Sequence, residues 1–176
     1  VADALGQLVA RTRKLVRGKL AETFDYGTHR FTDAIDSDGH GNGPFHLRLA
    51  LTREKTAGGE DTFIFDATAT DDQSPGPVNL LLNPDVPGTA LSMFYLGGDP
   101  AQVCKAGGPQ ALDEVRLREG SLLWPKWPAP LGMRGLTLMR FLAAVNGLIN
   151  VAGGKAPAAH SAYVISFMRG TYKTLE

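Results

Sequence analysis

Apolar residues recur at helical spacing along the start of the chain, within residues 1–24. Spacings of three and four positions place them on one side of a helix, and basic residues occupy much of the other side. The apolar residues are Leu5, Leu8, Val9, Leu15, Val16 and Leu20, and the basic ones are Arg11, Arg13, Lys14 and Arg17. The pattern predicts an N-terminal amphipathic helix from residue 2. Its basic face suits either contact with an acidic partner or plain exposure to water.

Three segments of strand character follow, over residues 27–36, 45–54 and 61–70. In the second, apolar residues alternate strictly with other residues, so one face of the predicted sheet is buried and the other is wet. The connecting residues 36–44 and 55–60 are rich in glycine, which supplies the positive φ of tight turns. The three segments therefore predict an antiparallel meander.

The regular alternation ends after Thr70, and prolines divide the next stretch of chain. A rigid turn is expected at residues 75–77, a short helical segment at 79–82, and an interruption at 83–87, where two prolines restrict the backbone. The apolar residues of 88–96 favour a buried helix.

The last third of the chain is dominated by one strongly amphipathic stretch, residues 136–152, which predicts a helix that ends at two consecutive glycines. Before it, residues 111–117 have strand character, and residues 119–130 read as a turn and an irregular segment rich in Trp and Pro. Residues 161–168 predict a final strand. Strands and helices are mixed without strict alternation, which is typical of the α+β class.

Length and composition fit one globular domain over residues 1–176. The chain has 176 residues, of which 43% are hydrophobic and 20% are charged, and a chain of this size buries a core of its own. We therefore expect a single α+β domain, an antiparallel sheet with packed helices. The first residue is valine and begins an amphipathic pattern, so we expect the domain to be an internal fragment of a larger subunit.

Charge and cysteine usage exclude several classes of partner and site. The 18 basic residues equal the 18 acidic residues, so no net field draws the chain to nucleic acid or to an anionic membrane. The longest apolar stretch is interrupted by Arg140 and is shorter than the roughly 20 residues that span a bilayer, so no membrane segment is expected. Cys104 is the single cysteine, which excludes an internal disulfide and a multi-thiolate zinc site and favours the cytoplasm.

Residues 36–42 contain the only stretch that suggests a cation. Asp36, Asp38 and Asn42 offer oxygen ligands, but the spacing of a calcium loop is missing, and a plain hairpin loop is the favoured interpretation. The histidines lack the spacing of a zinc helix, so no metal site is predicted. Neither a nucleophile elbow nor a phosphate loop is present, so the chain by itself has no recognisable ATP site.

Two residues in the second half have candidate chemistry. Arg134 lies just before the predicted helix, where its guanidinium and the free backbone amides can together hold a carboxylate. Alternatively, Arg134 only ties its loop to the fold. His160 is a candidate for a catalytic acid or base, because histidine is the residue type suited to that role near neutral pH. The alternative is a hydrogen-bonded structural histidine.

Several short segments form an ordered set along the chain. Residues 76–79 read Gly-Pro-Val-Asn, and residues 118–125 read Arg-Glu-Gly-Ser-Leu-Leu-Trp-Pro. The other segments are residues 26–33 with 36–39, residues 65–70, residues 128–130 and residues 156–159. In order and spacing, the set resembles the motifs of the hydantoinase B/oxoprolinase family, which has G-P-I-N at the opening of a helix and P-E-G-S-L-L-N-P. The family includes large subunits of ATP-dependent hydantoinases and of acetone and acetophenone carboxylases.

The resemblance implies a complex with a partner subunit of the hydantoinase A type, which binds ATP and activates the substrate or bicarbonate by phosphorylation. It also implies that the metal-binding residues precede this region, so ATP and a divalent metal are expected elsewhere in the parent complex and no cofactor is expected here. The domain is expected to be inactive alone. Asn79, in the Gly-Pro-Val-Asn segment, and Arg134 are the candidate substrate-binding residues.

The chain departs from the family pattern at residues 131–137 and 160–165, where polar residues are lost. The losses favour a ketone carboxylase of the acetone or acetophenone type. The alternatives are an ATP-dependent hydantoinase or 5-oxoprolinase, which hydrolyses cyclic amides, and a purely structural assembly module. A catalytic role predicts that Asn79, Arg134 and His160 meet in one cleft, whereas an assembly role predicts an exposed apolar patch.

Overall fold

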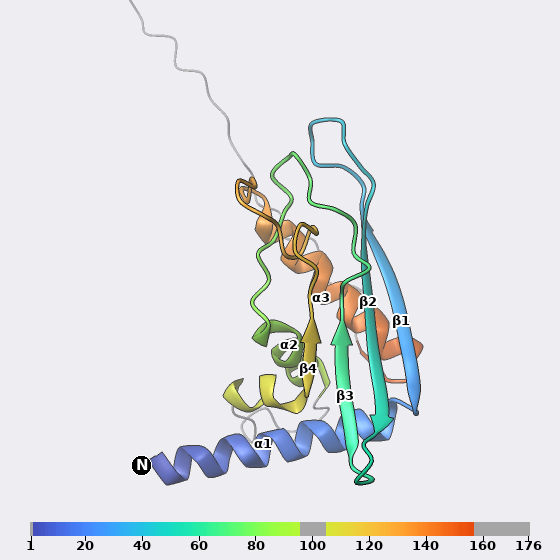
Figure 1. The fold of residues 1–176 in the computed structure, drawn as a ribbon, viewed down its shortest axis with the longest axis vertical. Coiled ribbons are helices and arrows are strands. Elements are labelled where there is room, and N and C mark those ends of the chain that lie inside the picture. Colours follow the sequence, from blue (N-terminus) through green and yellow to red (C-terminus); the bar gives the residue numbers. More distant parts are fainter. Residues whose placement is uncertain (1, 96–104, 157–176) are drawn as a thin grey trace, which may run out of the picture.

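The computed structural model describes residues 2–95 and 105–156, which form a sheet with helices packed on one face (Figure 1). The α+β class is confirmed, with helices on a mostly antiparallel sheet. The helices are α1 (Ala2–Thr23), α2 (Asp85–Tyr95) and α3 (Arg134–Val151), with short 3-10 helices η2 (Lys105–Gly107) and η3 (Pro109–Ala111). The strands are β1 (Gly27–Ile35), β2 (Phe45–Lys55), β3 (Asp61–Asp66) and β4 (Glu114–Arg116).

The sheet has the strand order β1-β2-β3-β4. The first three strands form the predicted antiparallel meander. β3 ends at Asp66 rather than at the predicted Thr70, because the Asp66 carboxylate accepts the backbone N–H of Thr68 at 2.8 Å and so closes a turn. β4 pairs with β3 in parallel, a pairing that the sequence pattern did not predict.

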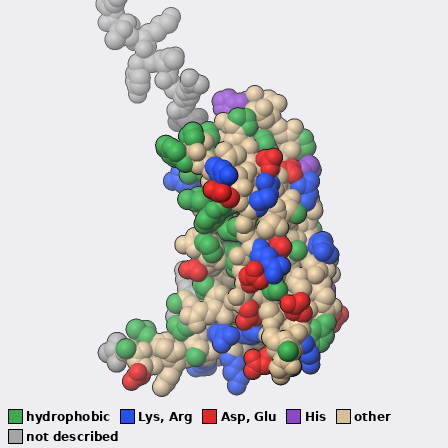
Figure 2. All heavy atoms as spheres, in the orientation of Figure 1, with side chains coloured by type: hydrophobic (Ala, Val, Ile, Leu, Met, Phe, Trp, Pro, Cys, Tyr) green, Lys and Arg blue, Asp and Glu red, His purple; other side chains and the backbone are tan. Residues whose placement is uncertain are grey.

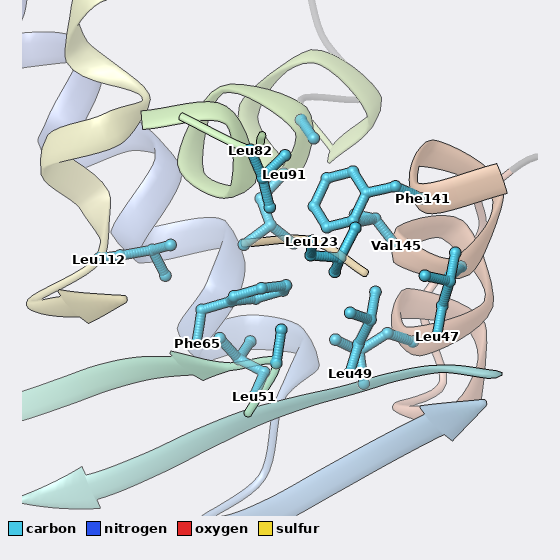
Figure 3. Close-up of a cluster of buried hydrophobic side chains, with 14 of the residues drawn as sticks. Leu47, Leu49, Leu51, Phe65, Leu82, Leu91, Leu112, Leu123, Phe141 and Val145 are labelled. Carbon is cyan, nitrogen blue, oxygen red and sulfur yellow. The ribbon is translucent and has the colours of Figure 1, made fainter. Parts of the chain in front are cut away.

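The core lies between the inner face of the sheet and the helices (Figure 3). Leu47, Leu49 and Leu51 of β2 are buried on that face, as their alternation predicted, and each contributes about 2 kcal/mol from removal of apolar surface from water. Phe65 of β3 meets Phe141 of α3 edge-on, with ring centroids 6.1 Å apart. Packing of α3 across the first three strands therefore closes one side of the core.

α1 confirms the predicted N-terminal helix, but its first turns project beyond the body of the molecule (Figure 1). Leu5 and Leu8 are 56% and 46% exposed. The basic face is only partly solvated. Arg17 is half-buried and donates to the Asp113 carboxylate at 2.8 Å, to the carbonyl of Ala111 at 3.1 Å and to the carbonyl of Asp61. Arg17 therefore fastens α1 to the chain that surrounds β4.

The predicted helical segment at residues 79–82 is wrong, because this stretch is extended. The backbone N–H groups of Leu80 and Leu82 donate to the carbonyls of Leu122 and Leu123 at 2.9 and 3.0 Å, so a partner distant in sequence replaces helical bonds. The helix expected at 88–96 begins earlier, at Asp85. Its first turn includes Pro87, which lacks the N–H that a first turn leaves unpaired.

α3 confirms the predicted C-terminal helix and begins two residues earlier than expected. Gly153 adopts φ +90° and donates to the carbonyl of Asn150 at 3.0 Å, while Gly154 donates to that of Ile149 at 2.9 Å, which ends the helix. Over the described ranges, no helix has the length and apolar character to cross a membrane. The predicted strand at 161–168 and Cys104 lie outside the described residues.

Candidate functional site

Two loops meet beside the N-terminus of α3, and we call the place where they meet the loop junction. One loop is residues 74–79 and the other is residues 128–134. The backbone N–H of Met133 donates to the carbonyl of Pro77 at 2.8 Å. The buried hydroxyl of Thr137, in the first turn of α3, donates to the carbonyl of Val78. The Gly-Pro-Val-Asn segment is therefore held against the start of α3 rather than opening a helix of its own.

Asn79 is fully buried at the loop junction. Its Oδ1 accepts the backbone N–H of Ser74 at 2.8 Å, and its Nδ2 donates to the carbonyls of Ser74, Gly76 and Pro130 at 2.9, 3.0 and 3.0 Å. Because the amide has only two N–H hydrogens, these contacts engage its full donor capacity. The side chain holds the two loops together, and its predicted contact with substrate stays a prediction.

Asp38 joins a third loop, residues 36–44, to the junction. Burial by itself would raise the pKa of Asp38, but hydrogen bonds from the Asn42 side chain, from the backbone N–H groups of His40 and Asn42 and from the Ser74 hydroxyl hold that pKa well below its usual range. The oxygen–donor distances run from 2.8 to 3.1 Å. A Cβ on Gly76 would lie 2.3 Å from Asp38 Oδ2, so only glycine fits beside this carboxylate.

The donors around Asp38 argue against a cation in this loop, because both carboxylate oxygens already face N–H or O–H groups. Within the described part of the chain, no three His, Cys, Asp or Glu residues are grouped as a metal site requires. The residues that the structure describes therefore do not fit the divalent metal that the family resemblance implies.

A hollow of about 630 Å³ opens at the surface of the loop junction. It is lined by Gln73, Ser74, Pro75 and residues 127–130. Trp127 is 93% exposed, and its loop is tied down by Lys126, whose backbone N–H donates to the Gln73 side chain at 2.7 Å. Since no acidic or basic side chain lines this hollow, it offers an apolar contact surface rather than acid–base chemistry.

Arg134 is exposed at the first position of α3 and donates to the carbonyl of Leu131 at 3.2 Å. Asn79 and Arg134 thus bind the carbonyls of consecutive residues, Pro130 and Leu131, so the structure brings both to the same loop. Arg134 does not line the hollow beside it. His160 lies outside the described residues, so the predicted meeting of all three side chains stays a prediction.

A charged cluster near the start of β2 was missed from the sequence. Asp71 accepts the backbone N–H of His46 at 2.7 Å, the imidazole Nδ1 of His46 at 2.9 Å and the guanidinium of Arg48. Burial alone would raise the pKa of Asp71, but these hydrogen bonds and the charge of Arg48 lower it below its usual range. The alternation of β2, which places His46 and Arg48 on its outer face, was the available signal.

The family motifs also interlock through the backbone. Leu122 is bonded to residues on both sides of loop 74–79. Its backbone N–H donates to the carbonyl of Asp71 at 2.9 Å, and its carbonyl accepts the N–H of Leu80 at 2.9 Å. The hydantoinase B/oxoprolinase family model matches residues 1–174. The chain belongs to the hydantoinase B/oxoprolinase family. Comparison with curated proteins and with solved structures gives no match.

In this hydantoinase B-family chain, the motif segments 36–39, 76–79, 118–125 and 128–130 thus form one connected layer. Their buried polar groups bind one another, through Asp38 to Ser74 at 2.9 Å and through Asn79 to Pro130 at 3.0 Å. The residues that carry the resemblance therefore have a structural role in the described part of the family fold.

Proposed function

We propose that this chain is part of the B-type subunit of a cytoplasmic, ATP-dependent ketone carboxylase of the acetone or acetophenone type, in which it acts as a structural and assembly module. The observation that carries the module role is the loop junction. Its buried polar side chains, Asp38, Asn79 and Thr137, all bind groups of this chain. The catalytic reaction then takes place in other parts of the parent complex. A hydantoinase A-type subunit binds ATP, and the divalent metal is bound outside the residues of this chain.

The ketone branch is supported by the apolar character of the start of α3. Leu136 is 39% exposed there, in the stretch where the family pattern is polar. An apolar surface suits a ketone better than a cyclic amide, which needs hydrogen-bond partners for its own N–H and C=O groups. Hydrolysis of hydantoin or 5-oxoproline is the alternative activity of the parent complex.

The assembly role is supported by exposed apolar side chains at two separate places. Trp127 is exposed at the loop junction, and Leu5 and Leu8 are exposed on the projecting part of α1. Large aromatic and aliphatic side chains on rigid elements are typical anchors of protein interfaces. We propose that they contact the remainder of the parent subunit and the A-type subunit.

The experiment uses the full-length subunit with its co-encoded partners. ATP hydrolysis is measured with acetone and bicarbonate, acetophenone and bicarbonate, hydantoin, and 5-oxoproline in parallel. Ketone- and bicarbonate-dependent turnover is expected. Turnover with a cyclic amide alone would replace the carboxylase by the hydrolase, and turnover by residues 1–176 alone would contradict the module role.

Trp127→Ala in the same complex separates assembly from folding. The variant is expected to keep the thermal midpoint of the isolated chain, since Trp127 is almost fully exposed, while weakening co-purification of the subunits. Leu81→Ala, at another exposed side chain, is the matched control. If the Trp127 variant and the unaltered subunit retain their partners equally, Trp127 does not contribute to the interface.

A further inference from the structure

The outer face of the sheet carries a second hollow, of about 410 Å³, on the side away from α3. Its lining includes three arginines, Arg30, Arg48 and Arg116, together with Asp66 and the short side chains of Ala50 and Ala69. Figure 2 shows basic and acidic side chains interspersed over the sheet. This hollow is lined by charged and hydroxyl groups, in contrast to the one at the loop junction.

The strand register explains why the hollow exists. Arg30 of β1 is paired with Ala50 of β2, Ala50 with Asp66 of β3, and Asp66 with Arg116 of β4. Paired residues point to the same face of a sheet, so these four form one row across all four strands. The methyl group of Ala50 leaves a gap between Arg30 and Asp66, whose Cα atoms are two strand spacings, roughly 10 Å, apart.

The charges at the two ends of the gap have opposite signs. Arg48 is paired with Asp71, and Arg116 holds Glu114 through two hydrogen bonds of 2.8 and 2.7 Å. In the part of the chain that is described, Arg30 forms no ion pair or hydrogen bond through its side chain, and Asp66 forms no ion pair. One cation is therefore left at the β1 end and one anion at the β3–β4 end.

Asp66 is held in place for this arrangement. Its Oδ1 accepts both the backbone N–H and the hydroxyl of Thr68, at 2.8 and 2.6 Å, which fixes the side chain at the strand end. The Glu114 carboxylate raises the pKa of Arg116, and the charge of Asp66 adds to that effect. The negative charge of Asp66 therefore acts on its neighbour in the row, Arg116.

We propose that this hollow binds a small zwitterion of the amino-acid type, with its carboxylate on Arg30 and its ammonium group beside Asp66. A guanidinium fork matches a carboxylate in shape and charge. A simple anion would leave the Asp66 carboxylate without an ion-pair partner, and a dianion would place its second carboxylate beside that of Asp66. The volume lies within the range of small-molecule sites, about 300–1,000 Å³. The inference rests on the sheet register and charges and is independent of the proposed function.

The test titrates the 176-residue chain, labelled with nitrogen-15, with three probes at equal ionic strength. They are 6-aminohexanoate, which carries both charges, hexanoate, which lacks the ammonium group, and adipate, which has two carboxylates. Saturable shifts of the backbone amides of Arg30, Ala50 and Asp66 are expected with 6-aminohexanoate, at roughly tenfold tighter affinity than with either other probe, because each of the other probes loses one charged contact. Equal affinity for hexanoate or adipate, or no saturation, would overturn the proposal.

Two variants test the ends of the hollow separately. Arg30→Gln and Asp66→Asn are each expected to weaken binding of 6-aminohexanoate by about tenfold. Asparagine keeps the Oδ1 acceptor that Thr68 uses, so the strand end is retained. Arg11→Gln, at an exposed arginine of α1 that does not line the hollow, is the matched control and should bind as the unaltered chain does. Unchanged binding by either hollow variant, with an unchanged thermal midpoint, would also overturn the proposal.

Discussion

At the scale of single residues, Asn79 has the clearest role in the described part of the chain. The motif in the sequence selected this residue, but its hydrogen-bond partner Pro130 lies 51 positions away along the chain. No local sequence pattern predicts a contact between residues so far apart. The sequence therefore identified Asn79 but not its hydrogen-bond partners. The same holds for Asp38, whose partner Ser74 is 36 positions away.

Replacement of Asn79 by alanine should destabilise the fold severely. The change leaves the Ser74 N–H and the Gly76 carbonyl buried without their partner, so the free energy of unfolding should fall by about 2–4 kcal/mol. Urea denaturation of the 176-residue chain measures it. Asn83→Ala is the control, because exposed Asn83 only accepts the N–H of Asp85 at 2.8 Å. A loss no greater than that of the control would contradict the structural role.

Gly76→Ala tests the close packing against Asp38. The added methyl group would lie 2.3 Å from Oδ2 of Asp38, so the Asp38 loop must move, and we expect a loss of about 1–3 kcal/mol in unfolding free energy. Gly58→Ala places its methyl group 3.7 Å from the nearest atom and should have a smaller effect. Equal effects of the two substitutions would show that the Asp38 loop moves to accommodate the methyl group at little cost in free energy.

At the scale of elements, periodic segments were predictable and pairings between distant segments were not. The alternation of Leu47, Leu49 and Leu51 identified β2 and its buried face. Residues 79–82 were misassigned as helical, because their backbone partners, Leu122 and Leu123, come from another part of the chain. Strand character was predicted at residues 111–117, and β4 forms within that stretch at Glu114–Arg116. Its parallel pairing with β3 was not predictable, because the local sequence does not say which strand lies beside it.

Gly147→Ala tests the contact between α3 and β1. A methyl group at Gly147 would lie 2.3 Å from the ring of Phe31, and the resulting overpacking should lower the free energy of unfolding by about 1–3 kcal/mol. Alanine otherwise favours a helix by about 1 kcal/mol over glycine. Gly135→Ala in the same helix, with open space around the new methyl group, should therefore stabilise the protein. Thermal and urea unfolding of both variants measure the contrast, and stabilisation by both would show that α3 does not approach β1 this closely.

At the scale of the whole molecule, carboxylates with lowered pKa connect separate elements. Hydrogen bonds from Tyr26 and Arg53 lower the pKa of Asp61, which links β3 to the end of α1 because Arg53 also donates to the carbonyl of Ala21 at 2.6 Å. Asp38 and Asp71 tie the loops to the sheet in the same way. The stability of the whole fold therefore depends on these groups being ionised.

The sign of the pH dependence follows from these lowered pKa values. A carboxylate whose pKa is lower in the folded state stabilises the fold above its unfolded value of 3.8, and the stabilisation is lost as pH falls through the folded pKa. Unfolding free energy measured from pH 7 to pH 2 should decline below about pH 5. Asp71→Asn should lower stability at pH 7 and converge with the unaltered chain near pH 2. A constant difference over that range would contradict the assignment.

The parallel pairing of β3 with β4 has a consequence for the order of folding. β1, β2 and β3 follow one another through short turns, so their contacts close small loops. β4 can reach β3 only after residues 67–113 have been arranged between them, and closing a long loop before its contacts form slows folding. We expect the meander to form early and the β3–β4 pairing late, so that the loop junction, whose segment 118–134 follows β4, is completed last.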